Sequence, residues 1–284
     1  MAKVFDRVGR GGQVTGPAGL TGADLHVWHG VVDVETGTPG EPPVSGLAIL
    51  DAGERAHCRR FVRRADRVRF AATHAARRRL LACYLEVDPS SIRFGRSPCC
   101  ECGSAEHGPP VIGWPPTDIT FNFSGSGDHW LLAVTRAHRV GADIEVPRDI
   151  DTGQLAACLT TAEQQDLTNQ PAGARLQMFY RCWTRKEAVL KACGIGLRGA
   201  LGGLAVAPGR SGPVEVRHTC KAGPDVWAVR DLAAEPGPAG GEGTAGTPGW
   251  LGAVAQPAAA GGRFWYREAA SAEGGDPDTA ATPD

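Results

Sequence analysis

The sequence has no long apolar run and almost no net charge, and each absence excludes a class of protein. No stretch of its 284 residues approaches the roughly 18 consecutive apolar residues of a membrane span. The polar, glycine-rich start contains no apolar segment typical of a secretory signal peptide. The formal net charge of −1 gives no support to general nucleic-acid binding. We therefore expect a soluble, cytoplasmic protein with neither membrane nor nucleic acid as partner.

The composition fits a folded protein in a reducing compartment. Hydrophobic residues make up 42% of the chain and charged residues 21%, which is typical of globular rather than disordered sequences. Nine cysteines without a signal peptide indicate free thiols rather than a disulfide framework. A chain of 284 residues could form one large domain or two of ordinary size.

Segments rich in glycine, alanine and proline divide the chain. Residues 1–22 predict a flexible arm, residues of about 233–249 a flexible loop, and residues 268–284 a disordered tail. Between them lie an N-terminal lobe over residues 23–136 and a C-terminal lobe over residues 137–258. Each lobe contains strands and helices, so the expected fold class is α+β, with two similar lobes in one chain.

The N-terminal lobe combines a first strand with a strongly basic helical region. ADLHVWHGVV alternates well enough to predict a strand. Residues 51–85 then turn helical and include CRRFVRRADRVRF. This charge has two interpretations, two solvated helix faces or a surface that binds anions.

The middle of the chain predicts three strands. Polar and apolar residues alternate from Ile119 to Ser124, as in a half-buried strand. Ser124–Gly127 then predicts a loop whose backbone amides could approach an anion. Leu131–Thr135 and Val140–Val146 are expected to pair as an antiparallel hairpin. WLGAVAQ, later in the chain, could be a final strand.

Asp143 and Glu145 lie two positions apart on an expected strand, so their side chains share one face. Two like charges about 7 Å apart are costly unless a cation lies between them. A hard cation such as Mg²⁺ prefers carboxylates, water and phosphate oxygens. The competing interpretation is an exposed edge strand whose polar face is acidic.

WTRKEAVLKACGIGL predicts a helix that ends at a glycine. Trp183, Glu187 and Lys191 are spaced i, i+4, i+8 and share one face. A surface Glu–Lys pair would explain two of them, but a large aromatic side chain is usually at least partly buried. Lys186 lies about 100° round the helix from Glu187, so it could be exposed or could reach the same cavity. Three carboxylates, two lysines, a glycine loop and a basic helix suit a pyrophosphate-containing substrate and phosphoryl-type transfer.

These segments together resemble the signature of the Sfp-type 4′-phosphopantetheinyl transferases. VGADIEV is similar to the family's G-[IVA]-D-[IV]-E strand, and WTRKEAVLK is similar to its W-[STC]-x-K-E-[AS]-x-x-K helix, some forty residues later. FNFSGSGD resembles F-N-[LIVF]-S-H-[ST]-G, and CCECGSAEHGPP resembles C-x-x-C-G-x-x-H-G-[KR]-P. CRRFVRRADRVRF resembles the family's basic helical region. The resemblance extends over roughly residues 24–257, in the family's order.

The resemblance implies both a fold and a reaction. The fold would be the pseudo-twofold 4′-phosphopantetheinyl transferase fold, with coenzyme A in the cleft between two α+β lobes of a monomer. The reaction would transfer 4′-phosphopantetheine from coenzyme A to a serine of an apo acyl or peptidyl carrier protein, releasing 3′,5′-ADP, with Mg²⁺ as cofactor. Carriers of fatty-acid, polyketide and peptide synthesis are all compatible with the sequence.

The resemblance also implies catalytic and metal-binding residues by matching position. Asp143, Glu145 and Glu187 would hold Mg²⁺ on the pyrophosphate. Glu187 would also act as the general base toward the serine, directly or through water. Lys191 would be the second catalytic residue, able to protonate the leaving phosphate.

Five residues are expected to bind the phosphates of coenzyme A. Lys186 and Lys191 would neutralise phosphate charge, and Ser124 with nearby backbone would contact the pyrophosphate. Arg64 and Arg69 are candidates for the 3′-phosphate.

Three departures from the family's pattern bear on how coenzyme A is recognised. Gly125 stands where the family has a phosphate-binding histidine, and Pro109 where it has Lys or Arg. Glu54 and His57 occupy places that are often basic. His129 or Arg96 could substitute for the missing contacts.

Two alternatives stay open. The chain could be a non-catalytic homologue that binds coenzyme A or a carrier protein. Its intact acidic and lysine set favours an enzyme, because a pure binder has no need of a base. Separately, Cys99, Cys102 and His107 could ligate zinc, although no fourth ligand is evident.

Overall fold

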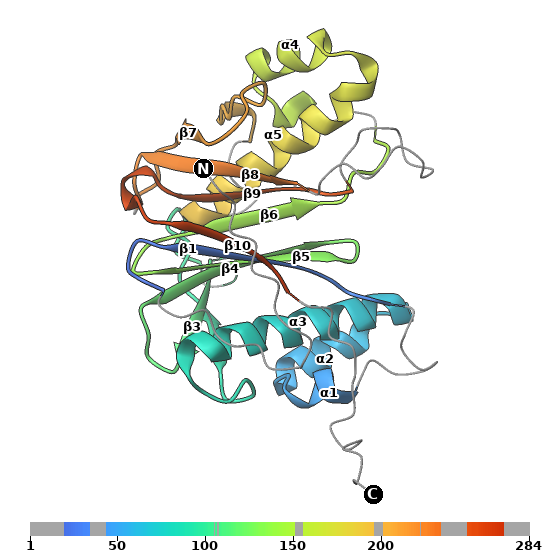
Figure 1. The fold of residues 1–284 in the computed structure, drawn as a ribbon, viewed down its shortest axis with the longest axis vertical. Helices are drawn as coiled ribbons and strands as arrows, with labels where there is room; N and C mark the ends of the chain where they lie inside the picture. The colour runs from blue at the N-terminus through green and yellow to red at the C-terminus, as the bar shows by residue number, and fades with distance from the viewer. Residues whose placement is uncertain are drawn as a thin grey trace, which may run out of the picture.

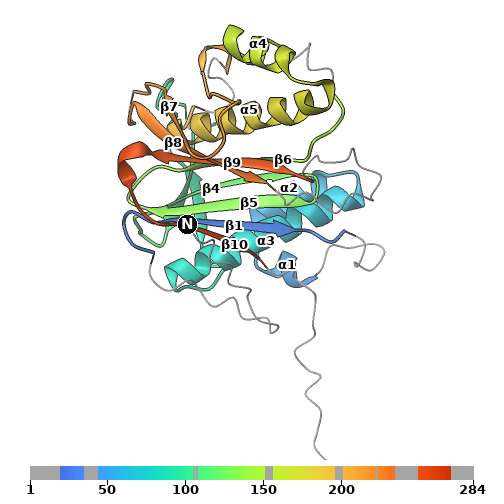
Figure 2. The same cartoon turned by 45° about the horizontal axis from the view of Figure 1, so that its top comes forward.

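Two four-stranded sheets lie against each other between two layers of helices (Figures 1 and 2). The computed structural model describes residues 20–34, 44–104, 106, 108–150, 156–195, 201–221, 223–233 and 249–269. The expected arm before residue 20, the loop of 234–248, the tail after residue 269 and His107 lie outside these residues.

The first sheet has the strand order β10-β1-β5-β4, with a separate hairpin of β2 and β3 nearby. The bounds are β1 (Leu25–Val31), β2 (Arg93–Arg96), β3 (Pro110–Trp114), β4 (Ile119–Ser126), β5 (His129–Arg136) and β10 (Phe264–Glu268). The helices on this side are α1 (Val44–Ala48), α2 (Ala52–Arg60) and α3 (Arg64–Leu85).

The second sheet has the strand order β6-β9-β8-β7 and carries the other long helix. Its strands are β6 (Gly141–Glu145), β7 (Val214–Arg217), β8 (Val226–Ala233) and β9 (Leu251–Pro257). The helices are α4 (Thr161–Asn169) and α5 (Ala172–Cys193), with short 3₁₀ turns at Ala156–Cys158, Leu201–Gly203 and Ala258–Ala260. None of the helices in the described parts of the chain is long and apolar enough to cross a membrane. The protein is therefore a mixed α+β structure in which each sheet is packed with helices.

The side-chain alternation of β5 explains the layering. Leu131 and Ala133 join Ile144 of β6 in the core between the two sheets. Leu132 and Val134 point the other way, into the core beneath α3. Because successive strand side chains point to opposite faces, a strand that is apolar at every position is buried on both sides.

The expected hairpin of residues 131–135 with 140–146 is not formed. β5 is a central strand whose two edges pair with β1 and β4. β6 belongs to the other sheet, where it pairs with β9. Once β1 and β4 occupy both edges of β5, no edge remains for β6, and the chain crosses between sheets at the turn after Arg136.

The expected Ser124–Gly127 loop is also corrected. β4 continues to Ser126, which pairs with His129, so only Gly127 and Asp128 form the turn. Gly127 has φ 56°, a conformation that glycine adopts at little cost.

Helix boundaries follow the capping residues seen in the sequence. Thr160 caps α4 and forms a reciprocal capping box with Glu163. α5 ends at Gly194, which is left-handed with φ 77°. The predicted end of this helix at a glycine is confirmed.

Gly141 lets α5 rest directly on β6. A Cβ atom at this position would collide with the backbone carbonyl of Ala188 and crowd the amide of Ala192. Only glycine allows this close approach of helix and strand backbones. The last two turns of α5 are thereby fixed beside Asp143 and Glu145.

β10 is a strand that the sequence did not predict. It follows β9 and returns to the first sheet, where it pairs in parallel with β1 from Leu25↔Phe264 to His29↔Glu268. The amide and guanidinium of Arg263 donate hydrogen bonds to Asp24, just before β1. The chain thus ends its described part on the sheet with which it began.

The basic helical region is not simply a pair of solvated faces. Arg78 of α3 is fully buried and pairs with Asp51 and Glu54, each at 2.7 Å. Arg77 pairs with Glu54 at 2.6 Å. Asp51 and Glu54 also form the capping box of α2. The acidic residue that departs from the family's basic pattern therefore holds two arginines inside the N-terminal helices.

We expect Glu54→Gln to reduce stability in a pH-dependent way. Burial alone would raise the pKa of Glu54, but hydrogen bonds from His74, the Asp51 amide and Arg78 lower it from 4.5 to about 2. A lowered folded-state pKa contributes stability that is present above about pH 4.5 and lost as the pH falls toward 2. The difference corresponds to roughly 3 kcal/mol at neutral pH.

Urea unfolding of the parent and Glu54→Gln between pH 2.5 and 7 measures this effect. The two free energies of unfolding should converge as the pH falls. Glu215→Gln, on the exposed face of β7, is the matched control and should follow the parent. A constant gap between parent and Glu54→Gln at every pH would contradict the prediction.

Candidate functional site

Polar side chains of β4 bind the open edge of β6. Asn122 Oδ1 accepts a hydrogen bond from the Ala142 amide at 3.1 Å. Ser126 Oγ accepts one from the Val146 amide at 3.1 Å. These residues alternate along β4, so they lie on one face of it. Side chains here replace a strand neighbour and satisfy backbone donors of β6 that would otherwise lack partners.

The same face of β4 orients the two carboxylates of β6. Ser124 Oγ donates a hydrogen bond to Asp143 Oδ1 at 2.9 Å. Ser126 Oγ donates one to Glu145 Oε2 at 2.7 Å. Asp143 is buried and Glu145 half-buried. The acidic edge-strand interpretation, which requires solvated carboxylates, is therefore excluded.

Lys191 of α5 joins this group. Its Nζ lies 2.6 Å from Asp143 Oδ1 and also donates to Ser124 Oγ at 3.1 Å and to the Ala142 carbonyl at 3.2 Å. Glu187, one turn earlier on α5, is buried. Trp183 is partly buried and stacks on Phe179, as its place on the same stripe predicts. The stripe of α5 is therefore a wall of the site rather than a solvated face.

Two buried carboxylate oxygens in this group have no hydrogen-bond partner among the described residues. They are Asp143 Oδ2 and Glu187 Oε1. A buried acceptor without a partner is costly, so such atoms commonly await a ligand, water or ion.

Burial and mutual repulsion change the acidity of all three carboxylates. Burial raises the pKa of Asp143, while Lys191 and Ser124 oppose the rise. Burial, and then the charge of Asp143, raises the pKa of Glu145. Burial raises the pKa of Glu187 to about 7; Lys191 opposes this rise, and Asp143 and Glu145 add to it. Positive charge arriving at this cluster would favour the ionised forms.

The donor set fits a hard divalent cation in its chemistry. Carboxylate oxygens are the ligands that Mg²⁺ prefers, and two of those present have no hydrogen-bond partner within the described part of the chain. Within the described residues, however, no group of three or more His, Cys, Asp or Glu side chains closes on a single metal position. Lys191 Nζ, in contact with Asp143, provides the positive charge of the cluster in this structure.

Lys186, which is expected to neutralise phosphate charge, contacts residues outside the carboxylate cluster in this structure, and its phosphate-binding role stays a prediction. Its side chain is fully buried, and Nζ lies 2.6 Å from Glu163 of α4. It also donates to the carbonyls of Cys158 and Leu201, at 2.8 and 2.7 Å. These partners use all three donors of the ammonium group, so the structure gives Lys186 a role in joining α5 to α4 and two 3₁₀ turns.

Arg64 and Arg69 lie on α3, and the hydrogen bonds described for them go to residues outside the carboxylate cluster. Arg69 pairs with Asp128, in the turn after β4, at 2.6 Å and with Asp66 at 3.1 Å. Arg64 donates to the Val34 carbonyl at 3.5 Å. Their assignment to the 3′-phosphate stays a prediction, and Arg69 would have to bind it while also neutralising two carboxylates.

The two residues suggested as substitutes for a histidine at position 125 are engaged elsewhere. His129 shares a hydrogen bond of 3.0 Å with His29, which stacks on Trp250. Arg96, on the small β2–β3 hairpin, donates to the Gly108 carbonyl at 2.9 Å. Pro109 packs against Gly194 at the end of α5, a contact that suits an apolar ring.

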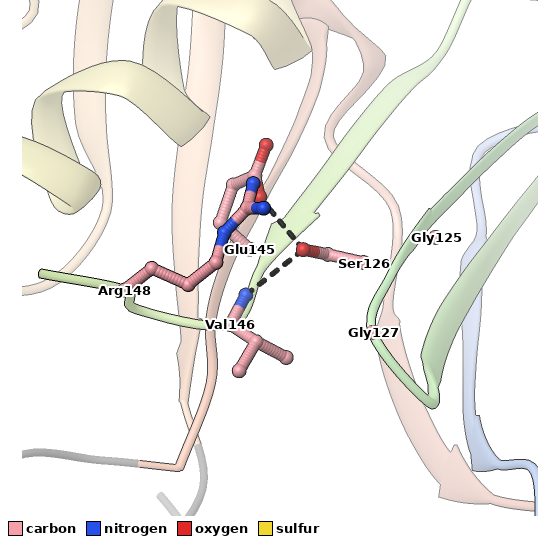
Figure 3. Close-up of a pocket in the computed structure, with 6 residues that line it drawn as sticks. All are labelled: Gly125, Ser126, Gly127, Glu145, Val146 and Arg148. Carbon is pink, nitrogen blue, oxygen red and sulfur yellow. Dashed lines mark hydrogen bonds between the residues drawn. The ribbon is translucent and has the colours of Figure 1, made fainter. Parts of the chain in front are cut away.

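A pocket of about 390 Å³ opens beside Glu145 (Figure 3). It is lined by Gly125, Ser126, Gly127, Glu145, Val146 and Arg148. The first three residues come from the end of β4 and its turn, and the last three from the end of β6 and the segment that follows. The pocket therefore lies where the edges of the two sheets meet.

Sequence reasoning missed four residues of this region. Asn122 and Ser126 bind β6, Arg148 lines the pocket, and the Tyr180 hydroxyl bonds to the backbone of Arg148. The alternation of polar residues in β4 was a usable signal for the first two. Nothing local marks Arg148 or Tyr180, because their roles depend on contacts between segments.

The zinc hypothesis gains no support from the described residues. No metal-binding group is formed around Cys99 and Cys102 there, and His107 lies outside that part of the chain.

Comparison with known proteins assigns the chain to a family. Residues 139–240, which include β6, α5 and the signature residues, match the 4′-phosphopantetheinyl transferase superfamily. The 4′-phosphopantetheinyl transferase HetI of Nostoc sp. (strain PCC 7120) is 30% identical over 186 residues, covering 63% of this chain and 72% of HetI. The chain belongs to the 4′-phosphopantetheinyl transferase superfamily. Its resemblance to the Sfp-type family, seen first in the sequence, is confirmed.

Two further relatives of the chain are also named 4′-phosphopantetheinyl transferases. The 4′-phosphopantetheinyl transferase Sfp of Bacillus subtilis (strain 168) is 27% identical, covering 60% of this chain and 71% of Sfp. The 4′-phosphopantetheinyl transferase AcpT of Escherichia coli O157:H7 is 37% identical over a shorter region, 34% of this chain and 49% of AcpT. By family and by these relatives, the protein is an enzyme, a 4′-phosphopantetheinyl transferase.

We expect Lys186→Met to destabilise the transferase strongly. Removing one partner of a buried ion pair leaves an uncompensated charge and costs about 3–5 kcal/mol. The double variant Lys186→Met with Glu163→Gln should recover part of the loss, because no unpaired charge remains. Urea unfolding measures both, with exposed Lys221→Met as the matched control. A Lys186→Met protein of parental stability with weakened coenzyme A binding would contradict the structural role and support phosphate binding by Lys186.

Proposed function

We propose that the transferase moves 4′-phosphopantetheine from coenzyme A to a serine of an apo acyl or peptidyl carrier protein, releasing 3′,5′-ADP. One observation carries this proposal. Asp143, Glu145, Glu187 and Lys191 converge at the edge of β6, where a pocket opens and two buried carboxylate oxygens have no hydrogen-bond partner among the residues that the structure describes. A site that concentrates negative charge in this way is suited to a cation and a polyphosphate together.

We further propose the pseudo-twofold arrangement of the family. The lobes would be residues 23–136 and 137–258 of a monomer, with coenzyme A in the cleft between them. Support comes from the two four-stranded sheets, each covered by a 22-residue helix, α3 or α5. β10 would extend the first lobe beyond these bounds, since it pairs with β1.

In the proposed reaction the carrier's serine oxygen attacks the phosphorus that bears pantetheine. A new serine O–P bond forms as the bond to the bridging oxygen breaks, and 3′,5′-ADP leaves. Glu187 accepts the serine proton, directly or through water, because its carboxylate faces the cluster without a hydrogen bond on Oε1. Lys191 places an ammonium group where negative charge develops and can supply a proton to the leaving phosphate.

The remaining residues of the cluster prepare these groups. Ser124 forms hydrogen bonds with both Asp143 and Lys191, so it holds the carboxylate and the ammonium group in place beside each other. Ser126 holds Glu145 at the pocket. Asp143, Glu145 and Glu187 would hold Mg²⁺, which when bound neutralises charge on the pyrophosphate.

A second candidate is a homologue that binds coenzyme A or a carrier without transfer. Gly125 and Pro109 favour it, since they remove polar contacts that the family's pattern contains. Incubation with an apo carrier protein, coenzyme A and Mg²⁺ separates the two candidates by mass spectrometry. The proposed function predicts a mass increase of one phosphopantetheine group on the carrier's serine. Coenzyme A binding without any mass increase would support the binder and defeat the enzyme. Carriers from fatty-acid, polyketide and peptide synthesis should be compared side by side.

We expect Glu187→Gln to lower kcat by about 10²–10⁴-fold, the usual contribution of a positioned general base. Coenzyme A binding and thermal stability should change little, because the amide keeps the shape of the carboxylate. Single-turnover rates at saturating coenzyme A, measured beside thermal melts, test this. A parental single-turnover rate would remove Glu187 from the chemistry.

We expect Gly125→His to lower the KM for coenzyme A. Gly125 has no positive φ, and an added Cβ would meet only the His129 carbonyl, at 3.5 Å. A hydrogen bond to a charged group contributes about 1.5–3 kcal/mol, or roughly 10- to 150-fold in binding. Gly125→Ala is the matched control, since it adds the Cβ without the imidazole. If both variants bind coenzyme A like the parent, position 125 does not contact its phosphates.

A further inference from the structure

Arg148 projects a cationic side chain into the pocket beside Glu145. It follows β6 by three positions and lines the pocket opposite Gly125 and Gly127 (Figure 3). The two glycines contribute only backbone to their wall, which leaves space for a ligand. Arg148 is thus a cationic side chain in the pocket wall that also contains the glycine at position 125.

Tyr180 of α5 fixes the backbone of Arg148. The Tyr180 hydroxyl accepts a hydrogen bond from the Arg148 amide at 3.1 Å and donates one to its carbonyl at 3.4 Å. Tyr180 is itself buried in the core beneath α5. The backbone of Arg148 is therefore anchored to α5 two helical turns before Glu187, although Arg148 itself lies in no helix or strand.

The guanidinium group of Arg148 has no partner among the described residues. No hydrogen bond or ion pair joins it to them, although its charge lowers the pKa of Glu145 against the larger effect of burial. Several other arginines in the described chain are bound to carboxylates. Arg69, Arg78 and Arg185 each lie within 2.7 Å of one. By contrast, hydrogen bonds hold the backbone of Arg148 in place, while its guanidinium group has no such carboxylate partner among the described residues.

We propose that Arg148 binds the pyrophosphate of coenzyme A in this pocket, with Tyr180 as its positioning residue. The inference rests on the proposed function and names a residue that supplies the contact lacking at Gly125. A guanidinium group offers paired N–H donors that match two phosphate oxygens, which suits it to this ligand. The pyrophosphate is favoured over other acidic groups because the pocket adjoins Glu145 of the carboxylate cluster. A pocket of about 390 Å³ also suits a small anionic group rather than the surface of a carrier protein.

The test compares ligand affinities by titration calorimetry, in Mg²⁺ and in EDTA, without a carrier. The ligands are coenzyme A and 3′-dephospho-coenzyme A, which share the pyrophosphate and differ in the 3′-phosphate. The proteins are the parent, Arg148→Ala, Arg148→Lys, Tyr180→Phe and, as matched control, Arg217→Ala on the exposed edge of β7. Thermal melts establish that each variant is folded.

We expect Arg148→Ala to weaken both ligands equally, by about 10- to 150-fold. Arg148→Lys should recover part of this loss, Tyr180→Phe should show a smaller loss, and Arg217→Ala should match the parent. Unchanged affinity in Arg148→Ala would overturn the proposal. So would a loss seen with coenzyme A alone, which would assign Arg148 to the 3′-phosphate.

Turnover assays with an apo carrier protein complete the test: if Arg148→Ala raised only the KM for the carrier, the proposal would be overturned in favour of a carrier contact. The parent protein separates this inference from the proposed function. A parent that fails to bind coenzyme A defeats the proposed function. If the parent and Arg148→Ala bind coenzyme A equally tightly, only the role of Arg148 is contradicted.

Discussion

The contact between Lys191 and Asp143 joins three segments that are far apart in the sequence. The ammonium group of α5 meets the carboxylate of β6 and the hydroxyl of Ser124 on β4. Burying either charge alone would cost several kcal/mol, so the helix and the strand must come together for either to be tolerated. Gly141 makes the meeting possible, because its missing side chain lets the backbones of α5 and β6 touch. The acidic cluster, the pocket and the open edge of β6 all depend on this junction.

Local patterns in the sequence determined the faces of elements well. The spacing of Asp143 and Glu145 placed both on one side of a strand, and the stripe of Trp183, Glu187 and Lys191 placed them together on a helix. Termination of α5 at Gly194 followed from the backbone freedom of glycine. These features depend on neighbours within a few positions, which is why the sequence alone could predict them.

The sequence did not predict in the same way which segments pair with one another. Strand periodicity says which side chains share a face, but it does not say which strand lies alongside, so the predicted hairpin of β5 with β6 was wrong. The two lysines of the signature make the same point. Lys186 and Lys191 differ by about 140° round the helix, and one meets Glu163 while the other meets Asp143. The number of basic residues in a segment does not show which of them form structural ion pairs and which are placed to bind a ligand.

The return of β10 to β1 has a consequence for the order in which the protein can fold during synthesis. Asp24 and Arg263 are hydrogen-bonded across 239 positions of chain. A ribosome releases the N-terminal segment first, so β1 must wait with one edge open until Phe264–Glu268 has emerged. An open strand edge is a template for pairing with other chains. The first sheet is therefore begun early and closed late, and a nascent chain halted before β10 would expose that edge to its neighbours.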